Sequence, residues 1–250
     1  MIEMDDQERK EAAVRLEALG NQILCAARDE LYMGMRFLDV ALSSFAYRMD
    51  MSVNPFGTDG NVIYFQPQYL GGLYRQNRIL VNRAYLHMVF HCIFRHMVKP
   101  GMDDRLWNLS CDIAAEHMTD SNFHRSVRFS KSLLRRETYR KLEQEGKVLN
   151  AERIYVILAQ WELSDKEMER LEAEFYVDDH KYWENQQPDR KPDPDLNRKW
   201  QDINERMETD LETFSKEASE KSGDLLDQIK IENKDRYDYK EFLRKLDRKS

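Results

Sequence analysis

The most informative segment of the chain is Leu86-His-Met-Val-Phe-His-Cys-Ile-Phe-Arg-His96, which contains three of the six histidines. It lies within residues 77–98, a stretch with helical periodicity that is almost uncharged on one face, as is typical of a buried helix. His87 and His91 are four residues apart, so on a helix both imidazoles project from the same face. Because their neighbours are apolar, the ring nitrogens need partners inside the protein.

The next predicted helix, Leu106 to Met118, offers such partners. It places Asp112 and Glu116 four residues apart on one face, in apolar surroundings. A buried carboxylate is costly unless it is paired or binds a metal. Two imidazoles and two carboxylates on consecutive helices can form a metal site. The alternative is a buried hydrogen-bond network of the same groups that holds the two helices together.

The remaining histidines and cysteines of this region receive no role as ligands. His96 follows His87 by nine residues, about 180° around a straight helix, so we expect a structural or surface histidine unless the helix ends before it. The buried free cysteines are interpreted as packing residues. The residues set aside in this way are His96, His117, His124, Cys92 and Cys111.

Outside the helices, one segment indicates a sheet. Asp59-Gly60 is a strong turn signal between two extended runs, and Pro67 cannot continue a central strand. We therefore expect a β-hairpin at about residues 51–66. With helical periodicity in the rest of the chain, and only 9 Gly and 6 Pro, the expected fold class is mainly α with a small β-hairpin (α+β).

The uneven distribution of charge predicts the domain organisation. Residues 51–124 contain 12 charged side chains in 74, whereas residues 189–250 contain 32 in 62. Three prolines in residues 186–194 forbid a helix there. We expect a domain over residues 1–185, a Pro-rich linker at 186–195 and a charged helical extension over 196–250.

The extension carries an apolar stripe at helical spacing. We favour packing of this stripe onto the main domain over binding of a partner protein. The stripe consists of Trp200, Ile203, Met207, Leu211 and Phe214.

Composition excludes several classes of function. The 250 residues carry 39 Lys+Arg against 46 Asp+Glu, a net charge of −7, which argues against nucleic-acid binding. No apolar run reaches the ~18 residues of a membrane span, and the acidic N-terminus does not resemble a signal peptide. Three unpatterned cysteines fit a cytoplasmic protein. No phosphate-binding loop and no nucleophile elbow occur.

The order of these motifs resembles a known family. Thr58-Asp-Gly60, Tyr64-Phe-x-Pro67, a loop, the histidine helix and Leu106-Trp-Asn-Leu-x-x-Asp112-Ile are similar to a metallopeptidase-like, zincin-like domain over about residues 7–185. Val177-Asp-Asp-His180-x-x-Trp183 is similar to a second, more C-terminal element of that family. In bacteria the domain usually precedes a von Willebrand factor A-like domain and is associated with MoxR-type AAA+ ATPases. The chain stops at Ser250 within a charged helical stretch, so we expect a fragment of a longer protein.

The resemblance implies zinc ligands at His87, His91 and Asp112. The family's His-Glu-x-x-His falls on residues 87–91, but Met88 stands where the glutamate acts as general base. Glu116 is implied as a neighbour of the ligands or as a substitute acid/base. The function expected is a zinc-metallopeptidase-like domain that is weakly active or inactive on a peptide substrate.

Two other functions remain open. The chain can be a non-catalytic adaptor for an AAA+ ATPase or another protein partner, or a helical module whose histidines only form hydrogen bonds. Met88 favours the adaptor over the peptidase.

Overall fold

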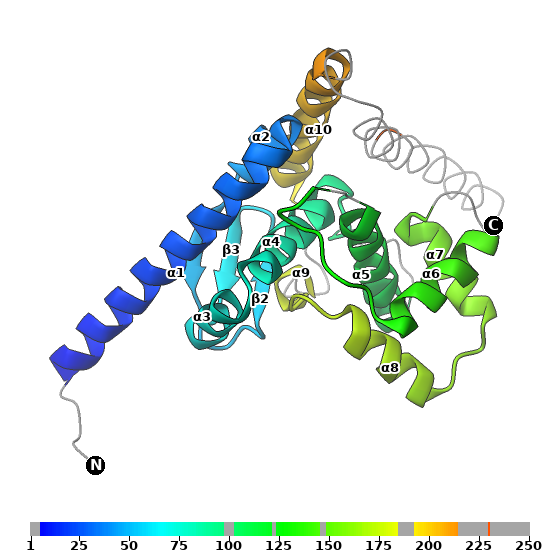
Figure 1. Cartoon of the computed structure of the whole chain (residues 1–250), viewed down its shortest axis with the longest axis horizontal. Helices are drawn as coiled ribbons and strands as arrows, with labels where there is room; N and C mark the ends of the chain where they lie inside the picture. The colour runs from blue at the N-terminus through cyan, green and yellow to red at the C-terminus, as the bar shows by residue number, and fades with distance from the viewer. Residues whose placement is uncertain are drawn as a thin grey trace.

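The computed structural model describes residues 6–97, 103–121, 124–145, 149–184, 193–214 and 230. Within them the chain is mainly helical with one three-stranded sheet, so the predicted fold class is confirmed. Helix α4 runs through the middle, with the sheet on one side and α5 to α8 on the other (Figure 1). No helix in these ranges is long and apolar enough to cross a bilayer.

The N-terminal segment is one long helix, α1 (Asp6–Gly34), followed by the short elements η1 (Arg36–Leu38) and α2 (Asp39–Leu42). Its C-terminal half is anchored by buried residues from Ile23 to Leu31 and contacts α4, α3 and β1. Its first half extends beyond the body of the molecule (Figure 1).

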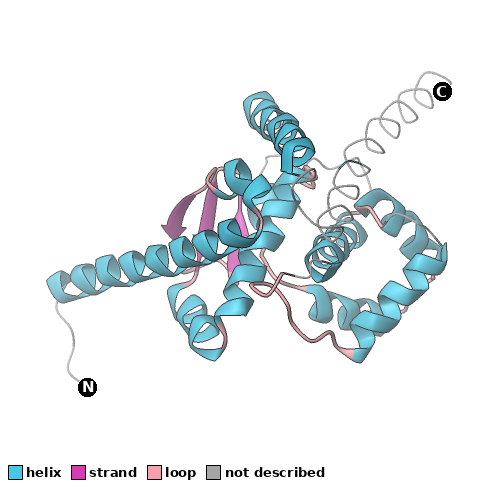
Figure 2. Cartoon of the chain, turned by 45° about the horizontal axis from the view of Figure 1, so that its top comes forward, coloured by secondary structure: helices cyan, strands magenta, loops and turns pink. Residues whose placement is uncertain are grey.

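The sheet consists of β1 (Ala46–Met49), β2 (Phe56–Thr58) and β3 (Val62–Phe65) in the order β1-β3-β2, and lies beside α1 (Figure 2). Strands β2 and β3 form the predicted antiparallel hairpin, whose turn contains Gly60 at φ +86°. The hairpin begins only at Phe56, because the residues before it form turns. Strand β1, which pairs parallel to β3, was not predicted.

The segment after the hairpin is helical, where a loop was expected. Helix α3 (Pro67–Gln76) begins with Pro67, whose fixed φ suits a first helical position. The Gln66 side chain accepts a hydrogen bond from the backbone N–H of Tyr69, and this cap completes the helix start. Helix α4 (Arg78–Ile93) follows directly, with Asn77 as its N-cap.

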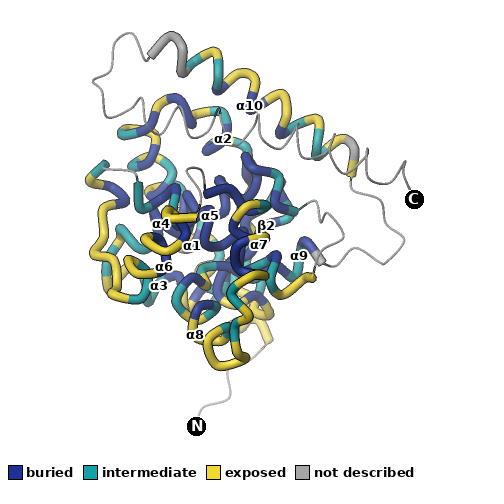
Figure 3. Tube along the Cα trace, turned by 90° about the vertical axis from the view of Figure 1, so that its right-hand side faces the viewer, coloured by how far each residue is buried: buried dark blue, intermediate teal, exposed yellow. Residues whose placement is uncertain are grey.

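Helix α4 is the centre of the core, since every residue from Val81 to Ile93 is buried (Figure 3). It belongs to an apolar cluster with α1 and the sheet. A second cluster joins α5 (Asp104–Ser121) to the helices that follow. These are α6 (Leu133–Glu145), α7 (Ala151–Gln160), α8 (Asp165–Phe175) and α9 (Lys181–Glu184).

Helix α10 (Pro194–Phe214) packs onto the first cluster, as the apolar stripe predicts. Trp200, Ile203 and Met207 are buried there, and the Trp200 indole donates to the Gly60 carbonyl over 3.0 Å. The helix begins inside the predicted linker. The structure does not describe linker residues 186–192 or the side chains of residues 211–214. The division at residues 185 and 195 stays a prediction.

Candidate metal centre

The two histidines of α4 face each other at the centre of the molecule. Both side chains are fully buried, and their Nε2 atoms lie 2.7 Å apart. The four-residue spacing on an intact helix produces this alignment, as the sequence predicts. Two ring nitrogens are therefore directed at one point.

Asp112 reaches the same point from α5. Its Oδ1 lies 3.3 Å from Nε2 of His87 and 3.3 Å from Nε2 of His91. The structure thus brings together the three residues that the sequence predicts as ligands. Contact between the two apolar helices α4 and α5 places them side by side.

A fourth residue, Asp178, joins the site and was not predicted as a ligand. Its Oδ1 lies 3.3 Å from Nε2 of His87 and 3.5 Å from Nε2 of His91. The only signal in the sequence was the Val177–Trp183 element, which gave no ligand assignment. The donor atoms of His87, His91, Asp112 and Asp178 all lie within 4.8 Å of one another.

The backbone of β2 positions Asp178. The Asp179 N–H donates to the Phe56 carbonyl over 2.6 Å, which holds the segment between α8 and α9 against the hairpin. Gly57 permits this approach, because a Cβ there would lie 2.7 Å from the Asp179 carbonyl oxygen.

His180 completes the surroundings of the two carboxylates. Its Nε2 lies 3.1 Å from Asp112 Oδ1 and 3.2 Å from Asp178 Oδ1. The imidazole stacks on Trp183 with ring centroids 3.8 Å apart and an interplanar angle of 8°. This stacking fixes the ring with its nitrogen toward the site.

The donor set fits a metal ion. Asp112 Oδ1, both carboxylate oxygens of Asp178 and Nε2 of His180 are buried and make no hydrogen bond to any described residue. Donors about 2.0–2.2 Å from a tetrahedral zinc lie roughly 3.3–3.6 Å from each other. The distances of 3.3–3.5 Å between histidine nitrogens and the carboxylate oxygens of Asp112 and Asp178 match this value, whereas the 2.7 Å between the two histidine nitrogens is shorter.

Glu116 supports His87 and faces away from the cluster. Its Oε1 lies 3.1 Å from Nδ1 of His87, while Oε2 accepts hydrogen bonds from Arg83 over 2.6 Å and from Arg135. Burial opposes the charge of Glu116, but Arg83, His87 and Arg135 outweigh it and hold the pKa of the carboxyl well below its usual value. This environment suits a fixed charged acceptor and does not suit the acid/base role that the sequence suggested.

His96 is buried and contacts His91, which agrees with the structural alternative and excludes the surface one. Helix α4 ends at Ile93 and Arg95 turns the chain with φ +54°. This turn brings Nδ1 of His96 to 2.8 Å from Nδ1 of His91. The straight-helix geometry behind the prediction does not apply, because the helix stops first.

The surroundings of the cluster favour positive charge. Burial disfavours charge on His87, yet Asp112, Asp178 and Glu116 raise its pKa well above the usual value. Burial likewise opposes charge on His180, and Asp112 and Asp178 raise its pKa to about 10. Both shifts reflect the two buried carboxylates, which a bound cation would neutralise.

Comparison with known families agrees with this geometry. The family described as "Putative metallopeptidase domain" matches residues 21–237. The chain belongs to this family. No curated protein and no solved structure matches it. The buried His/Asp cluster is therefore the candidate metal centre of a metallopeptidase-type domain.

Met88, which the sequence pattern aligns with the glutamate of the motif, is fully buried in the apolar cluster around α4. The histidines and cysteines set aside earlier are also outside the four-residue cluster. His117 contacts Glu143, His124 contacts Ser126, and Cys92 and Cys111 are buried in the two apolar clusters.

A cleft gives access to the centre from one side. It is a cavity of about 370 Å³ whose lining includes Asp112, Asp178 and His180. The Arg105–Glu172 ion pair, with Nε to Oε1 at 2.6 Å, forms part of the wall. The two carboxylates and His180 are the buried part of the cleft, whereas Arg105 and Glu172 are more exposed.

Proposed function

We propose that this metallopeptidase-type domain binds zinc through His87, His91, Asp112 and Asp178 and has little or no peptidase activity. The convergence of four buried donor atoms on one point carries the proposal. Imidazole nitrogens and carboxylate oxygens are ligands that zinc accepts in four-coordinate sites. When bound, zinc supplies Lewis acidity toward a carbonyl group.

The residues around the ligands hold them in the form that binds a metal. Glu116 accepts a hydrogen bond from Nδ1–H of His87, which leaves the lone pair on Nε2. His96 does the same for His91 through the contact between the two Nδ1 atoms. The raised pKa of His87 favours a proton on Nε2 without a metal ion; a metal ion would displace that proton, and these two contacts would then hold both histidines as neutral ligands.

Two features argue against efficient catalysis. Four protein ligands complete a tetrahedral site, whereas catalytic zinc sites keep one position open. The second feature is the missing base, because the Met88 thioether cannot accept a proton and Glu116 is already held by two arginines. The loss of a general base typically costs about 10²–10⁴ in rate.

A second candidate function is a non-catalytic adaptor for an AAA+ ATPase or another protein partner. The exposed apolar side chains on the projecting half of α1 favour it. Val14 is 66% exposed and Leu19 is 52% exposed. Such residues on a surface helix can bind another protein.

The test compares cleavage of fluorescein-labelled casein by the tag-free chain, His87→Ala, Met88→Glu and Met88→Glu/His87→Ala, with zinc present. We expect no cleavage or slow cleavage by the natural chain. Circular dichroism checks that Met88→Glu folds, because the new carboxylate enters an apolar cluster. Fast cleavage by the natural chain that His87→Ala abolishes would contradict the proposal.

A further inference from the structure

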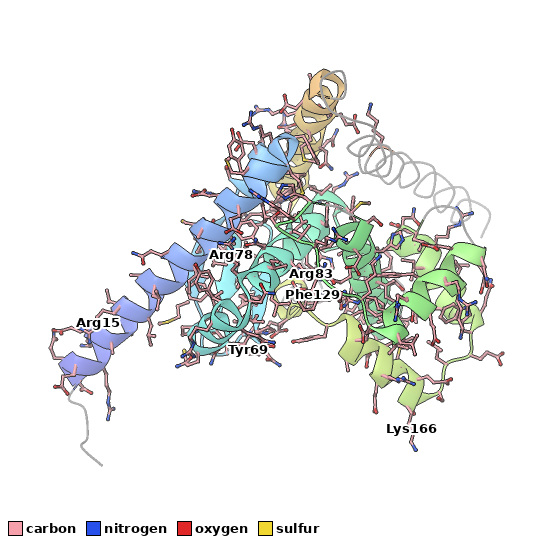
Figure 4. All side chains as sticks on the ribbon, viewed as in Figure 1. Arg15, Tyr69, Arg78, Arg83, Phe129 and Lys166 are labelled. Atoms are coloured by element: carbon pink, nitrogen blue, oxygen red, sulfur yellow. The ribbon has the colours of Figure 1, made fainter. Side chains whose placement is uncertain are left out.

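A second cavity, of about 330 Å³, lies on the other side of the centre between α3, α4 and residues 129–132. Its apolar lining includes Phe56, Leu73, Leu80 and Val177. This volume lies in the range of about 300–1,000 Å³ that is typical of ligand sites. Figure 4 labels Tyr69, Arg83 and Phe129, which line the cavity from three different segments.

Of the charged groups in the cavity wall, all but Lys131 are paired with one another, and Lys131 Nζ lies 5.8 Å from the centroid of the Tyr139 ring. Arg83 Nη2 lies 2.8 Å from Asp120 Oδ1 in addition to its contact with Glu116. Arg135 Nε lies 3.2 Å from Glu174 Oε1. Because these pairs satisfy each other, the surface that remains for a ligand is chiefly apolar.

The rim of the cavity is aromatic and exposed. Tyr69 is 50% exposed, and Phe129 and Tyr176 are each 46% exposed. In the described part of the chain, five aromatic side chains are counted among the exposed large hydrophobic residues, and three of them line this cavity. Aromatic side chains that gather around one opening are typical of sites that bind apolar groups.

This cavity and the metal cleft share a wall at Tyr176. Tyr176 lines both, and the residues after it divide between them: Val177 lines the apolar cavity, whereas Asp178 lines the cleft. The segment before α9 is therefore a shared wall. An extended chain that crosses Tyr176 can place one side chain in the apolar cavity and the adjacent backbone in the cleft.

We propose that the apolar cavity binds a large apolar side chain, aromatic by preference, of an extended polypeptide. The class of ligand rests on the proposed function, because a metallopeptidase-type domain handles polypeptides. By binding this side chain, the cavity would determine which residue of the bound polypeptide lies next to the metal centre, whether or not the polypeptide is cleaved.

The test measures binding of three fluorescein-labelled peptides to the full chain by fluorescence anisotropy, in excess EDTA and again with zinc. The peptides are acetylated, amidated Gly/Ser sequences that differ only in a central Phe, Ala or Asp. The variants are Tyr69→Ala and Phe129→Ala. Tyr74→Ala is the matched control, because Tyr74 is an exposed tyrosine on the same helix that does not line the cavity.

We expect the Phe peptide to bind about 10- to 100-fold more tightly than the Ala peptide, because it buries one aromatic side chain. Phe129→Ala and Tyr69→Ala should remove most of this preference, and Tyr74→Ala should keep it. Equal binding of the three peptides, absence of binding, or an equal loss in Tyr74→Ala would overturn the proposal. Zinc binding by the same samples separates the two hypotheses, since a peptide preference without zinc binding contradicts only the proposed function.

Discussion

At the scale of single residues, the centre depends on which nitrogen of each histidine carries a proton. When Nδ1 of His87 donates to Glu116 and Nδ1 of His91 donates to His96, two neutral rings would direct their Nε2 lone pairs at each other across 2.7 Å. Two lone pairs at that distance repel each other unless a proton or a metal ion lies between them. Glu116 and His96 therefore favour a proton or a metal ion between the two Nε2 atoms.

Glu116→Gln tests this support. The amide cannot balance Arg83 and Arg135, so we expect the free energy of unfolding to fall by about 3–5 kcal/mol, as when a buried ion pair loses one partner. Zinc affinity should fall about 10- to 100-fold, the usual effect of removing a group that orients a ligand. Urea unfolding and competitive zinc titration measure the two effects. Glu143→Gln, at an exposed partner of His117, should change neither.

Asp178→Asn tests the ligand that the sequence did not reveal. We expect a loss of zinc affinity larger than that of Glu116→Gln, because a direct donor is removed. Asp179→Asn is the control, because its side chain contacts Lys181, at the backbone N–H and at Nζ over 3.9 Å, and is not a donor of the cluster. Equal zinc affinity in both variants, measured by competitive titration, would exclude Asp178 as a ligand.

At the scale of elements, the sequence predicts residue positions that are set within one helix or turn. It does not predict positions that are set by contacts between segments far apart in the chain. The His87–His91 pair and the Asp112–Glu116 pair follow from spacing within helices, the family resemblance implies Asp112 as the ligand, and the hairpin follows from Asp59-Gly60. Asp178 lies 66 positions beyond Asp112, outside any helix, and is placed by the contact of Asp179 with Phe56. His96 depends on where α4 ends. Residue spacing within a helix therefore predicts neither the position of Asp178 nor that of His96.

Gly57→Ala tests the placement of Asp178 by the hairpin. A methyl group at residue 57 would lie 2.7 Å from the Asp179 carbonyl oxygen and 2.8 Å from the Tyr182 ring, so the segment that carries Asp178 must move. We expect zinc affinity to fall although no ligand is changed. Gly71→Ala, where a Cβ meets nothing within 4 Å, should leave the affinity unchanged and stabilise helix α3 slightly. Competitive zinc titration and thermal unfolding measure both variants.

At the scale of the whole molecule, the centre joins two apolar clusters. His87 and His91 come from the cluster around α4, whereas Asp112 comes from the helix that begins the second cluster. Helix α10, which follows the other elements of the first cluster in the sequence, also contributes buried residues to that cluster. Trp200 connects this helix to Phe45, at a centroid distance of 5.4 Å, and to the hairpin turn.

Trp200→Ala should destabilise the chain strongly. It removes a fully buried indole and a hydrogen bond to Gly60, and we expect a loss of about 3–5 kcal/mol in the free energy of unfolding. Trp161→Ala is the comparison, because that indole is only half-buried and bonds to the exposed Glu145. If urea unfolding gave equal losses for both variants, α10 would not belong to the core.

The most direct test of the central claim is a zinc titration of the tag-free chain against a chelator of known affinity. The account predicts one zinc ion per chain, with a loss of binding in His87→Ala and retention in His117→Ala. Bound zinc should also raise the unfolding temperature, since a ligand at 1,000 times its Kd stabilises the folded state by about 4 kcal/mol. A folded natural chain that binds no zinc, or whose zinc binding survives His87→Ala, would contradict the account.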